Sequence, residues 1–268
     1  MSNPTNSAVL YEKVGKVAVI TLNRPQTRNA LDDAISAALL EVVRRARDDR
    51  SVASVVLTGA GGAFCSGAYL GEASDNEKTF IGRDLVLDSQ SWFAELIGME
   101  KPVISAVDGV AVGAGFSMAL AADFVFVSSR ARLMPSFLGV GLVPDLAMMY
   151  VLPRLVGLAK AKEIIFSARP IAAEEAVALG IAQAVVPAQS LLDEALAFAR
   201  RFDDAPPRAL GMAKTILNRS FETDRAAMTQ LEAAAQSLCV ASDYHAEALR
   251  RFMAKEPALY PPSVPRPS

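Results

Sequence analysis

The chain has 268 residues, of which 52% are hydrophobic and 21% are charged, so it can form a sizeable buried core and global disorder is excluded. Its 27 Lys and Arg residues nearly balance its 29 Asp and Glu residues, which gives a net charge of −2. This balance, with no long basic run, provides no electrostatic basis for binding nucleic acid or an anionic membrane, and we expect neither as a partner.

Strand and helix patterns alternate along residues 1–205. Residues 8–22 alternate in polarity and are rich in Val and Ile, which predicts a β-hairpin. A pattern with helical spacing follows over 31–47, and Asn29 or Asp32 can cap this helix. Apolar runs predict further strands over 52–59, 101–109 and 124–129, and helical patterns cover 71–98 (after a loop), 114–122, 145–152, 158–168, 172–179 and 190–202. This alternation predicts an α/β core.

Residues 103–127 are nearly all apolar and resemble a membrane span at first sight. Asp108 and Asp123 interrupt the run, together with three glycines. Two carboxylates inside a membrane helix would be costly. We therefore expect a strand, a tight turn and a buried helix here instead.

Pro206 and Pro207 form the clearest boundary in the sequence. After them the pattern is almost wholly helical to about residue 254, and a proline-rich tail follows. We predict a core over residues 1–205 and a helical C-terminal region over residues 206–268.

The few cysteine and histidine residues exclude several kinds of chemistry. Cys65 and Cys239 are too few for a disulfide framework and favour a reducing, cytoplasmic setting, in keeping with an N-terminus that lacks the features of a secretory signal. The single histidine, His245, makes a His/Cys metal site unexpected. It also excludes Ser-His-Asp or Cys-His catalysis unless it is itself the base. We expect no metal.

Two glycine-rich turns are the first candidates for a functional site. One is the segment 64–68, FCSGA, after a strand, and the other is 113–115, GAG, which opens a helix. Glycine allows close approach of another backbone, and two backbone N–H groups brought together would form an oxyanion hole. The alternative is that both segments simply reverse the chain. Neither matches a nucleotide-binding fingerprint.

Several longer segments carry a resemblance to a known family. They are VAVITLNRPQTRNAL (17–31), VVLTGAGGAFCSGAYL (55–70), KPVISAVDGVAVGAGFSMALAAD (101–123), GVGLVPDLAMMYVLPRLVG (139–157) and SDYHAEALRRFMAKEPALY (242–260). In this order they make the chain similar to the crotonase (enoyl-CoA hydratase/isomerase) family. The resemblance implies a spiral of ββα units with a C-terminal helical region that assembles homotrimers, often paired into hexamers. It also implies an acyl-CoA thioester as substrate and no cofactor beyond its CoA moiety.

The resemblance assigns roles to individual residues. The two N–H groups that hold the thioester oxygen would belong to Ala68 and Ala114. The CoA- and substrate-binding positions would be Arg28, Ala30, Ser66, Tyr69, Leu70, Gly113 and Phe137, and Phe252 and Lys255 match positions that reach a neighbouring subunit's CoA site.

The departures from the family pattern indicate which reaction to expect. At the positions of the two glutamates that hold and activate water in a typical hydratase, this chain has Ser117 and Phe137. Asp145, in the turn LVPD, matches the aspartate of the dienoyl-CoA and 1,2-epoxyphenylacetyl-CoA isomerase branches. One carboxyl group that removes a proton and returns it elsewhere is sufficient for double-bond migration. We therefore expect isomerisation with Asp145 as the acid–base.

Four alternatives remain open at this stage. Asp145 can be a helix N-cap, because it follows a proline and precedes a helical run. A hydratase would need a non-standard second carboxylate, for which Asp84, Asp88 and Glu95 are available. A non-catalytic acyl-CoA-binding protein would keep the fold alone. An aryl-CoA dehalogenase would use Asp145 as nucleophile, but its histidine and tryptophan are replaced by Gln90 and Phe137.

Overall fold

The computed structural model describes residues 7–69 and 78–261, and of residues 78–82 and 85 the backbone alone. Leu70, one of the predicted binding residues, lies outside the described residues. Within the described part, no helix is long and apolar enough to cross a membrane.

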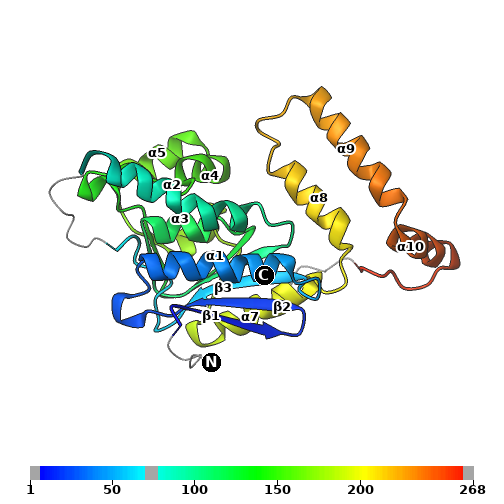
Figure 1. Cartoon of the computed structure of the whole chain (residues 1–268), viewed down its shortest axis with the longest axis horizontal. Coiled ribbons are helices and arrows are strands. Elements are labelled where there is room, and N and C mark those ends of the chain that lie inside the picture. Colours follow the sequence, from blue (N-terminus) through cyan, green and yellow to red (C-terminus); the bar gives the residue numbers. More distant parts are fainter. Residues whose placement is uncertain (1–6, 70–77, 262–268) are drawn as a thin grey trace.

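A six-stranded sheet forms the centre of the core, in the order β1-β2-β3-β4-β6-β9. Its first three strands are labelled in Figure 1. The predicted hairpin is confirmed, because β1 (Val9–Val14) pairs antiparallel with β2 (Val17–Leu22). The other strands are parallel: β3 (Ser54–Gly59), β4 (Val103–Val107), β6 (Phe124–Ser128) and β9 (Ala184–Val186). Layers on both faces of the sheet explain why β4 reads as a continuous apolar run and not as an alternating one.

The two faces of the sheet are covered by different helices. Ala18 and Ile20 face the larger apolar cluster, which includes the buried side of α1 (Asp33–Asp48), whereas Val17 and Val19 face a smaller cluster with α7 (Leu191–Ala199). This follows from the alternation of side chains along a strand. The helix α2 (Lys78–Ile97) packs against α1 (Figure 1).

A second, three-stranded sheet was not predicted. It consists of β5 (Val110–Val112), β7 (Arg132–Met134) and β8 (Ile171–Ala172), each only two or three residues long. The strand β5 follows β4 directly and leads into α3 (Ala114–Leu120), and β7 follows β6 in the same way. Each of these units has a strand in the large sheet followed by a strand in the small sheet. The structure thereby confirms the predicted fold class of ββα units.

The remaining core helices lie close to their predicted positions, with one consequential difference. They are α4 (Met148–Val156), α5 (Leu158–Ser167) and α6 (Ala173–Ala178). The prediction that a helix starts at residue 145 is wrong, because Leu146 and Ala147 adopt left-handed backbone conformations and delay the first turn of α4 to Met148. Asp145 therefore lies in a loop.

The C-terminal helices form an arm that extends away from the core (Figure 1). They are α8 (Pro207–Leu217), α9 (Arg225–Val240) and α10 (Asp243–Ala254), and neither α9 nor α10 contains a buried residue. The arm is attached through Lys214 on α8, whose Nζ lies 2.6 Å from the Asp123 carboxylate and donates to the Lys101 carbonyl at 3.0 Å. Burial lowers the pKa of the Lys214 ammonium, and Asp123 opposes this change.

Asn29 connects two loops that come from different parts of the sheet. Of the two predicted caps of α1 only Asp32 acts as one, since its carboxylate accepts from the Ile35 amide at 2.8 Å. The Asn29 side chain is fully buried, accepts from the Arg24 amide at 2.8 Å, and donates to carbonyls of the glycine-rich segment after β3, those of Ala60 (2.9 Å) and Ala63 (2.8 Å). Its φ of 59° is one that asparagine tolerates better than most residues.

We predict that Asn29→Ala destabilises the protein by on the order of 3 kcal/mol, because it leaves several buried polar groups unpaired and places alanine at a positive φ. The melting temperature measured by circular dichroism should fall by roughly 6–12 °C. The matched control is Asn23→Ala, which removes one exposed hydrogen bond to the Ser7 carbonyl. Equal melting temperatures for the two variants would contradict this role of Asn29.

Candidate active site

The glycine-rich segment after β3 is fixed against β5 by backbone hydrogen bonds. The amides of Phe64 and Cys65 both donate to the Val110 carbonyl at 3.1 Å, and the Val112 amide donates to the Cys65 carbonyl at 2.9 Å. The segment therefore runs beside the strand that leads into α3. The two predicted turns, far apart in sequence, lie together.

Glycine is required where these two segments touch. A Cβ atom on Gly115 would lie 2.4 Å from the Cys65 carbonyl oxygen, and one on Gly67 would lie 2.7 Å from the Val112 carbonyl oxygen. The same Cβ on Gly67 would be 3.8 Å from the Ala114 nitrogen. This contact places Gly67, directly before Ala68, next to Ala114, the first residue of α3. Turns that served only to reverse the chain would not need such a contact.

The amides of Ala68 and Ala114 have no acceptor among the residues that the structure describes. On either side of Ala68, the Gly67 amide is directed to the Cys65 sulfur at 3.4 Å and the Tyr69 amide donates to the Leu31 carbonyl at 2.9 Å. In α3 the first amide bonded within the helix is that of Ser117, which donates to the Gly113 carbonyl at 3.0 Å. Two neighbouring unpaired amides are the arrangement that stabilises a developing negative charge on oxygen.

Asp145 presents a buried carboxylate oxygen that has no hydrogen-bond partner. Burial raises the pKa of the Asp145 carboxyl above its ordinary value. The helix-cap interpretation of Asp145 is wrong, because the cap position of α4 is Ala147 and no side chain caps that helix. A carboxyl group whose pKa is shifted by desolvation is typical of functional residues.

Ser117 brings the Asp145 loop to α3. Its hydroxyl donates to the Asp145 carbonyl oxygen at 3.0 Å, and its side chain is only 1% exposed. Since Ala114 begins the same helix, the loop that carries the carboxylate is tied to the helix that carries one of the unpaired amides. From the sequence, Ser117 is expected only as the replacement of a glutamate, and this link to Asp145 is not predicted.

Phe137 adds an apolar surface to the same region. It is 6% exposed, and its ring carbons lie 3.7–3.9 Å from the position that a Cβ on Gly113 would occupy. The two positions at which the resemblance implies glutamates are therefore occupied by a hydroxyl that is already hydrogen bonded and by a hydrocarbon ring. Neither can ionise near neutral pH.

The other carboxylates considered as a second acid–base group are directed elsewhere. Glu95 pairs with Arg44 on α1 at 3.0 Å and also with Arg47, and these hydrogen bonds hold the pKa of its carboxyl below the ordinary value. Asp84 pairs with its neighbour Arg83 at 3.2 Å, and Asp88 is exposed on α2.

The predicted CoA-binding residues fall into two groups. Ser66 bridges the segments of the first group, since its amide donates to the Arg28 carbonyl at 2.9 Å and its hydroxyl donates to the Thr27 carbonyl at 2.8 Å. Ala30 in this group is buried, whereas Arg28 and Tyr69 are exposed. The second group, Phe252 and Lys255, lies at the end of the arm, and a single chain does not bring it to the first group (Figure 1).

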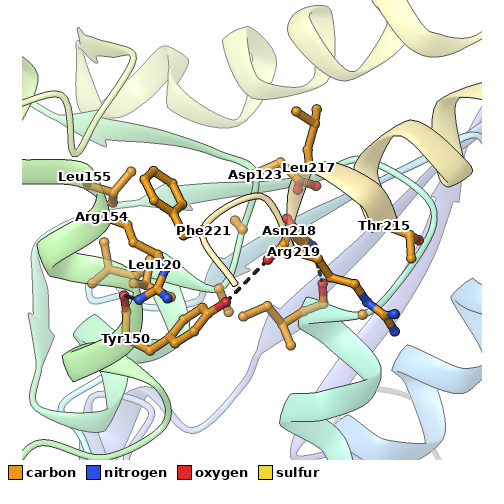
Figure 2. Close-up of a pocket in the computed structure, with 15 residues that line it drawn as sticks. Leu120, Asp123, Tyr150, Arg154, Leu155, Thr215, Leu217, Asn218, Arg219 and Phe221 are labelled. Atoms are coloured by element: carbon orange, nitrogen blue, oxygen red, sulfur yellow. Dashed lines mark hydrogen bonds between the residues drawn. The ribbon is translucent and has the colours of Figure 1, made fainter. Parts of the chain in front are cut away.

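Two cavities lie away from these residues. One of about 610 Å³ separates α4 from the end of α8 (Figure 2), where Arg154 lies 3.5 Å from the centre of the Tyr150 ring and the Tyr150 hydroxyl donates to the Asn218 carbonyl at 3.3 Å. The other, of about 640 Å³, lies between the end of α1 and the start of α8. Neither is lined by Ala68, Ala114 or Asp145. We therefore locate the candidate active site by its amides and its carboxylate and not by cavity size.

Known proteins identify the class to which this arrangement belongs. A family model described as enoyl-CoA hydratase/isomerase matches residues 12–261. A crystal structure of an enoyl-CoA hydratase from Polaromonas sp. JS666 superposes with a TM-score of 0.88 at 31% identity, covering 93% of this chain and 98% of that one. The chain therefore belongs to the enoyl-CoA hydratase/isomerase family, and the resemblance found in the sequence is confirmed.

Individual relatives carry two kinds of name. The chain is 34% identical to the short-chain-enoyl-CoA hydratase of Clostridium acetobutylicum. The 248 aligned residues cover 92% of this chain and 95% of the relative. The chain is 32% identical over 243 residues to the 1,2-epoxyphenylacetyl-CoA isomerase of Escherichia coli K12, with 89% and 92% covered. The chain is thus similar to named hydratases and to a named isomerase, and membership of one family is what these relatives share with it.

Cys65 lies between the two segments of the site and should not react as a nucleophile. Its side chain is fully buried, and burial raises the pKa of its thiol to about 12. We predict that iodoacetamide at pH 8 leaves Cys65 unmodified in the native protein and alkylates it in urea, as measured by peptide mass spectrometry. Cys239, half-buried on α9, is the internal comparison. Alkylation of native Cys65 as fast as in urea would contradict the buried thiol.

Proposed function

We propose that the protein isomerises an acyl-CoA thioester by proton transfer through an enolate. Asp145 would be the acid–base, and the amides of Ala68 and Ala114 would form the oxyanion hole. The observation that carries this proposal is the half-buried Asp145 side chain, whose Oδ1 atom is shielded from water without a hydrogen-bond partner, at a site where Ser117 and Phe137 stand at the positions for which the resemblance implies glutamate.

In the proposed mechanism the carboxylate of Asp145 takes a proton from the carbon next to the thioester carbonyl of a 3-enoyl-CoA. The electron pair of that C–H bond moves into the carbonyl group and forms an enolate. Hydrogen bonds from the two amides stabilise the new charge, by about 3–4 kcal/mol per donor in well-studied enzymes. The Asp145 carboxylic acid then returns the proton to a different carbon. The double bond has moved, and no water is consumed.

The raised pKa of Asp145 fits a group that must both accept and donate a proton. A carboxylate with an ordinary pKa is a weak base near neutral pH, and burial brings it closer to the working range of a general acid–base. Hydration is less well served, because the water would need a second group to orient it. The Ser117 hydroxyl already donates to the Asp145 carbonyl, and Phe137 offers no polar atom.

A hydratase is the second candidate, and the names of the relatives favour it. Besides the Clostridium enzyme, a crotonyl-CoA hydratase of Syntrophomonas wolfei is 32% identical over 251 residues and covers 93% of this chain. In a hydratase Asp145 would have to activate water alone. A protein that only binds acyl-CoA would turn over none of these thioesters.

We further propose that CoA docks on the segments around Arg28 and Ser66, with Ala30, Tyr69 and Leu70 beside it. No other cofactor is required by this chemistry. In a homotrimer, or a dimer of trimers, the arm over residues 206–268 would carry Phe252 and Lys255 to the site of a neighbouring copy. Both residues are exposed in the single chain, as this arrangement requires.

We predict that Asp145→Asn lowers kcat by about 100-fold or more on 3-enoyl-, dienoyl- or ring-epoxide-CoA thioesters, because the amide cannot carry the proton. Activity would be measured on purified protein with a panel that also contains 2-enoyl-CoA for hydration. Thioester binding, measured by calorimetry, should remain.

The matched control is Asp193→Asn, the same substitution at an exposed position in the first turn of α7. It should leave all activities unchanged. Full isomerase turnover by Asp145→Asn would remove Asp145 from the mechanism. Hydration of 2-enoyl-CoA as the dominant activity of the wild type would establish the second candidate instead.

Asp145→Asn should also stabilise the fold at neutral pH. The pKa of this carboxyl is raised in the folded protein, so its ionised form is disfavoured there, and the unfolded chain does not have this cost. The variant should therefore have a higher free energy of unfolding than the wild type above the raised pKa. The difference should shrink as the folded carboxyl protonates and vanish below about pH 3.9, the ordinary value. Urea denaturation from pH 4 to 8 measures it, and a difference independent of pH would contradict the cause given.

A further inference from the structure

Ser117 forms a hydrogen bond that none of the catalytic steps above uses. Its hydroxyl has two acceptors within reach, the Asp145 carbonyl oxygen at 3.0 Å and the Gly113 carbonyl oxygen at 3.4 Å. The shorter contact leaves the helix and crosses to a loop 28 residues further along the chain. A buried serine in a helix usually returns its proton to the preceding turn, so the choice of the loop is informative.

The loop that receives this hydrogen bond has a strained backbone. Leu146 and Ala147, directly after Asp145, have φ values of 43° and 58°, although neither is glycine. Such backbone conformations are strained in residues other than glycine and persist only where the surroundings hold them. The Asp145 carbonyl oxygen is held from two sides, by the Ser117 hydroxyl and by the Met148 amide at 3.0 Å. Fixing this carbonyl fixes the Cα atom from which the carboxylate projects.

The same helix carries one of the oxyanion-hole amides. Ala114 and Ser117 are three residues apart on α3 and so lie on one face of the helix, about 4.5 Å apart along its axis. A link from Ser117 to the Asp145 backbone therefore sets the separation between a proton carrier and an oxyanion donor. Catalysis depends on that separation, because a displacement of about 1 Å can lower a rate about 100-fold.

We propose that Ser117 is a positioning residue that holds the Asp145 carboxylate in register with the oxyanion hole. This inference rests on the proposed function, since it gives Ser117 a role only through Asp145. Ser117 itself transfers no proton and touches no substrate atom.

The test compares Ser117→Ala with Ser105→Ala. Ser105 is an equally buried serine on β4 whose hydroxyl has no hydrogen-bond partner, so its replacement removes a side-chain oxygen and no described hydrogen bond. Both variants would be assayed with 3-hexenoyl-CoA, following the conjugated product, at a temperature at which circular dichroism shows both to be folded. Alanine is favoured over serine in a helix, so Ser117→Ala should fold.

We expect Ser117→Ala to lower kcat by about 10- to 100-fold and to change KM by less than about threefold, because orientation is lost and binding is not. Ser105→Ala should match the wild type. In the Asp145→Asn background Ser117→Ala should have no further effect, since two residues that act through one group are not additive.

The outcomes separate the two proposals. Unchanged kcat in Ser117→Ala, with Asp145→Asn inactive, overturns the positioning role alone. A further loss of activity in the double variant, or an equal loss in Ser105→Ala, also overturns it. Unchanged activity in Asp145→Asn, or a wild type that isomerises no thioester, overturns the proposed function and the positioning role with it.

Discussion

The candidate site depends on one backbone contact, between the segment after β3 and the segment that joins β5 to α3. The Cys65 carbonyl oxygen accepts from the Val112 amide and would lie only 2.4 Å from a Cβ atom on Gly115. No side chain would take part in the proposed oxyanion hole, so alanine is acceptable at both proposed donor positions. The residue type is instead restricted at Gly67 and Gly115, where two backbones approach more closely than a Cβ atom permits. Asn29 holds the segment after β3 by donating to the carbonyls of Ala60 and Ala63.

The carboxylate is subject to the opposite constraint. Asp145 is half-buried, and a carboxylate oxygen that is shielded from water without a hydrogen-bond partner is unfavourable for folding. Asp145 also lies before two residues with left-handed backbones. Compensation comes from the apolar packing of the neighbouring residues Leu146 and Met148, which are 4% and 0% exposed. Desolvation of the ionised carboxylate has two consequences: it lowers the stability of the fold, and it raises the pKa of Asp145, as the proposed role as a base requires. The same desolvation strengthens a hydrogen bond from an amide to an enolate oxygen.

Much of this arrangement could be predicted from the sequence, because local patterns carry it. The hairpin and the helices have clear periodicity, the buried strands β3, β4 and β6 lie in apolar runs, and the glycine turns and Asp145 lie in recognisable motifs. The three-residue strand β9 was not predicted. The missed features are those decided by distant contacts. The strands β5, β7 and β8 are too short for a periodic signal and exist because they pair with one another. The preference of Asp for helix caps suggested a role that the left-handed residues after Asp145 prevent. Ser117 and Asn29 gave no signal, since the partners of their side chains become neighbours only in the folded chain.

The arm adds an argument about assembly that is independent of the site's chemistry. Helices gain most of their stability in water from burying an apolar face, yet α9 and α10 bury no residue within the single chain. Leu238, Phe252 and Met253 are 67%, 78% and 75% exposed. Side chains of this size on neighbouring helices are typical of a surface that another protein covers. The proposed trimer would cover it with further copies of this chain, and it would also explain why Phe252 and Lys255 lie far from the CoA segment of their own chain. A site completed in this way would form only when the arm packs against another copy of the chain. Assembly and substrate binding would then be coupled.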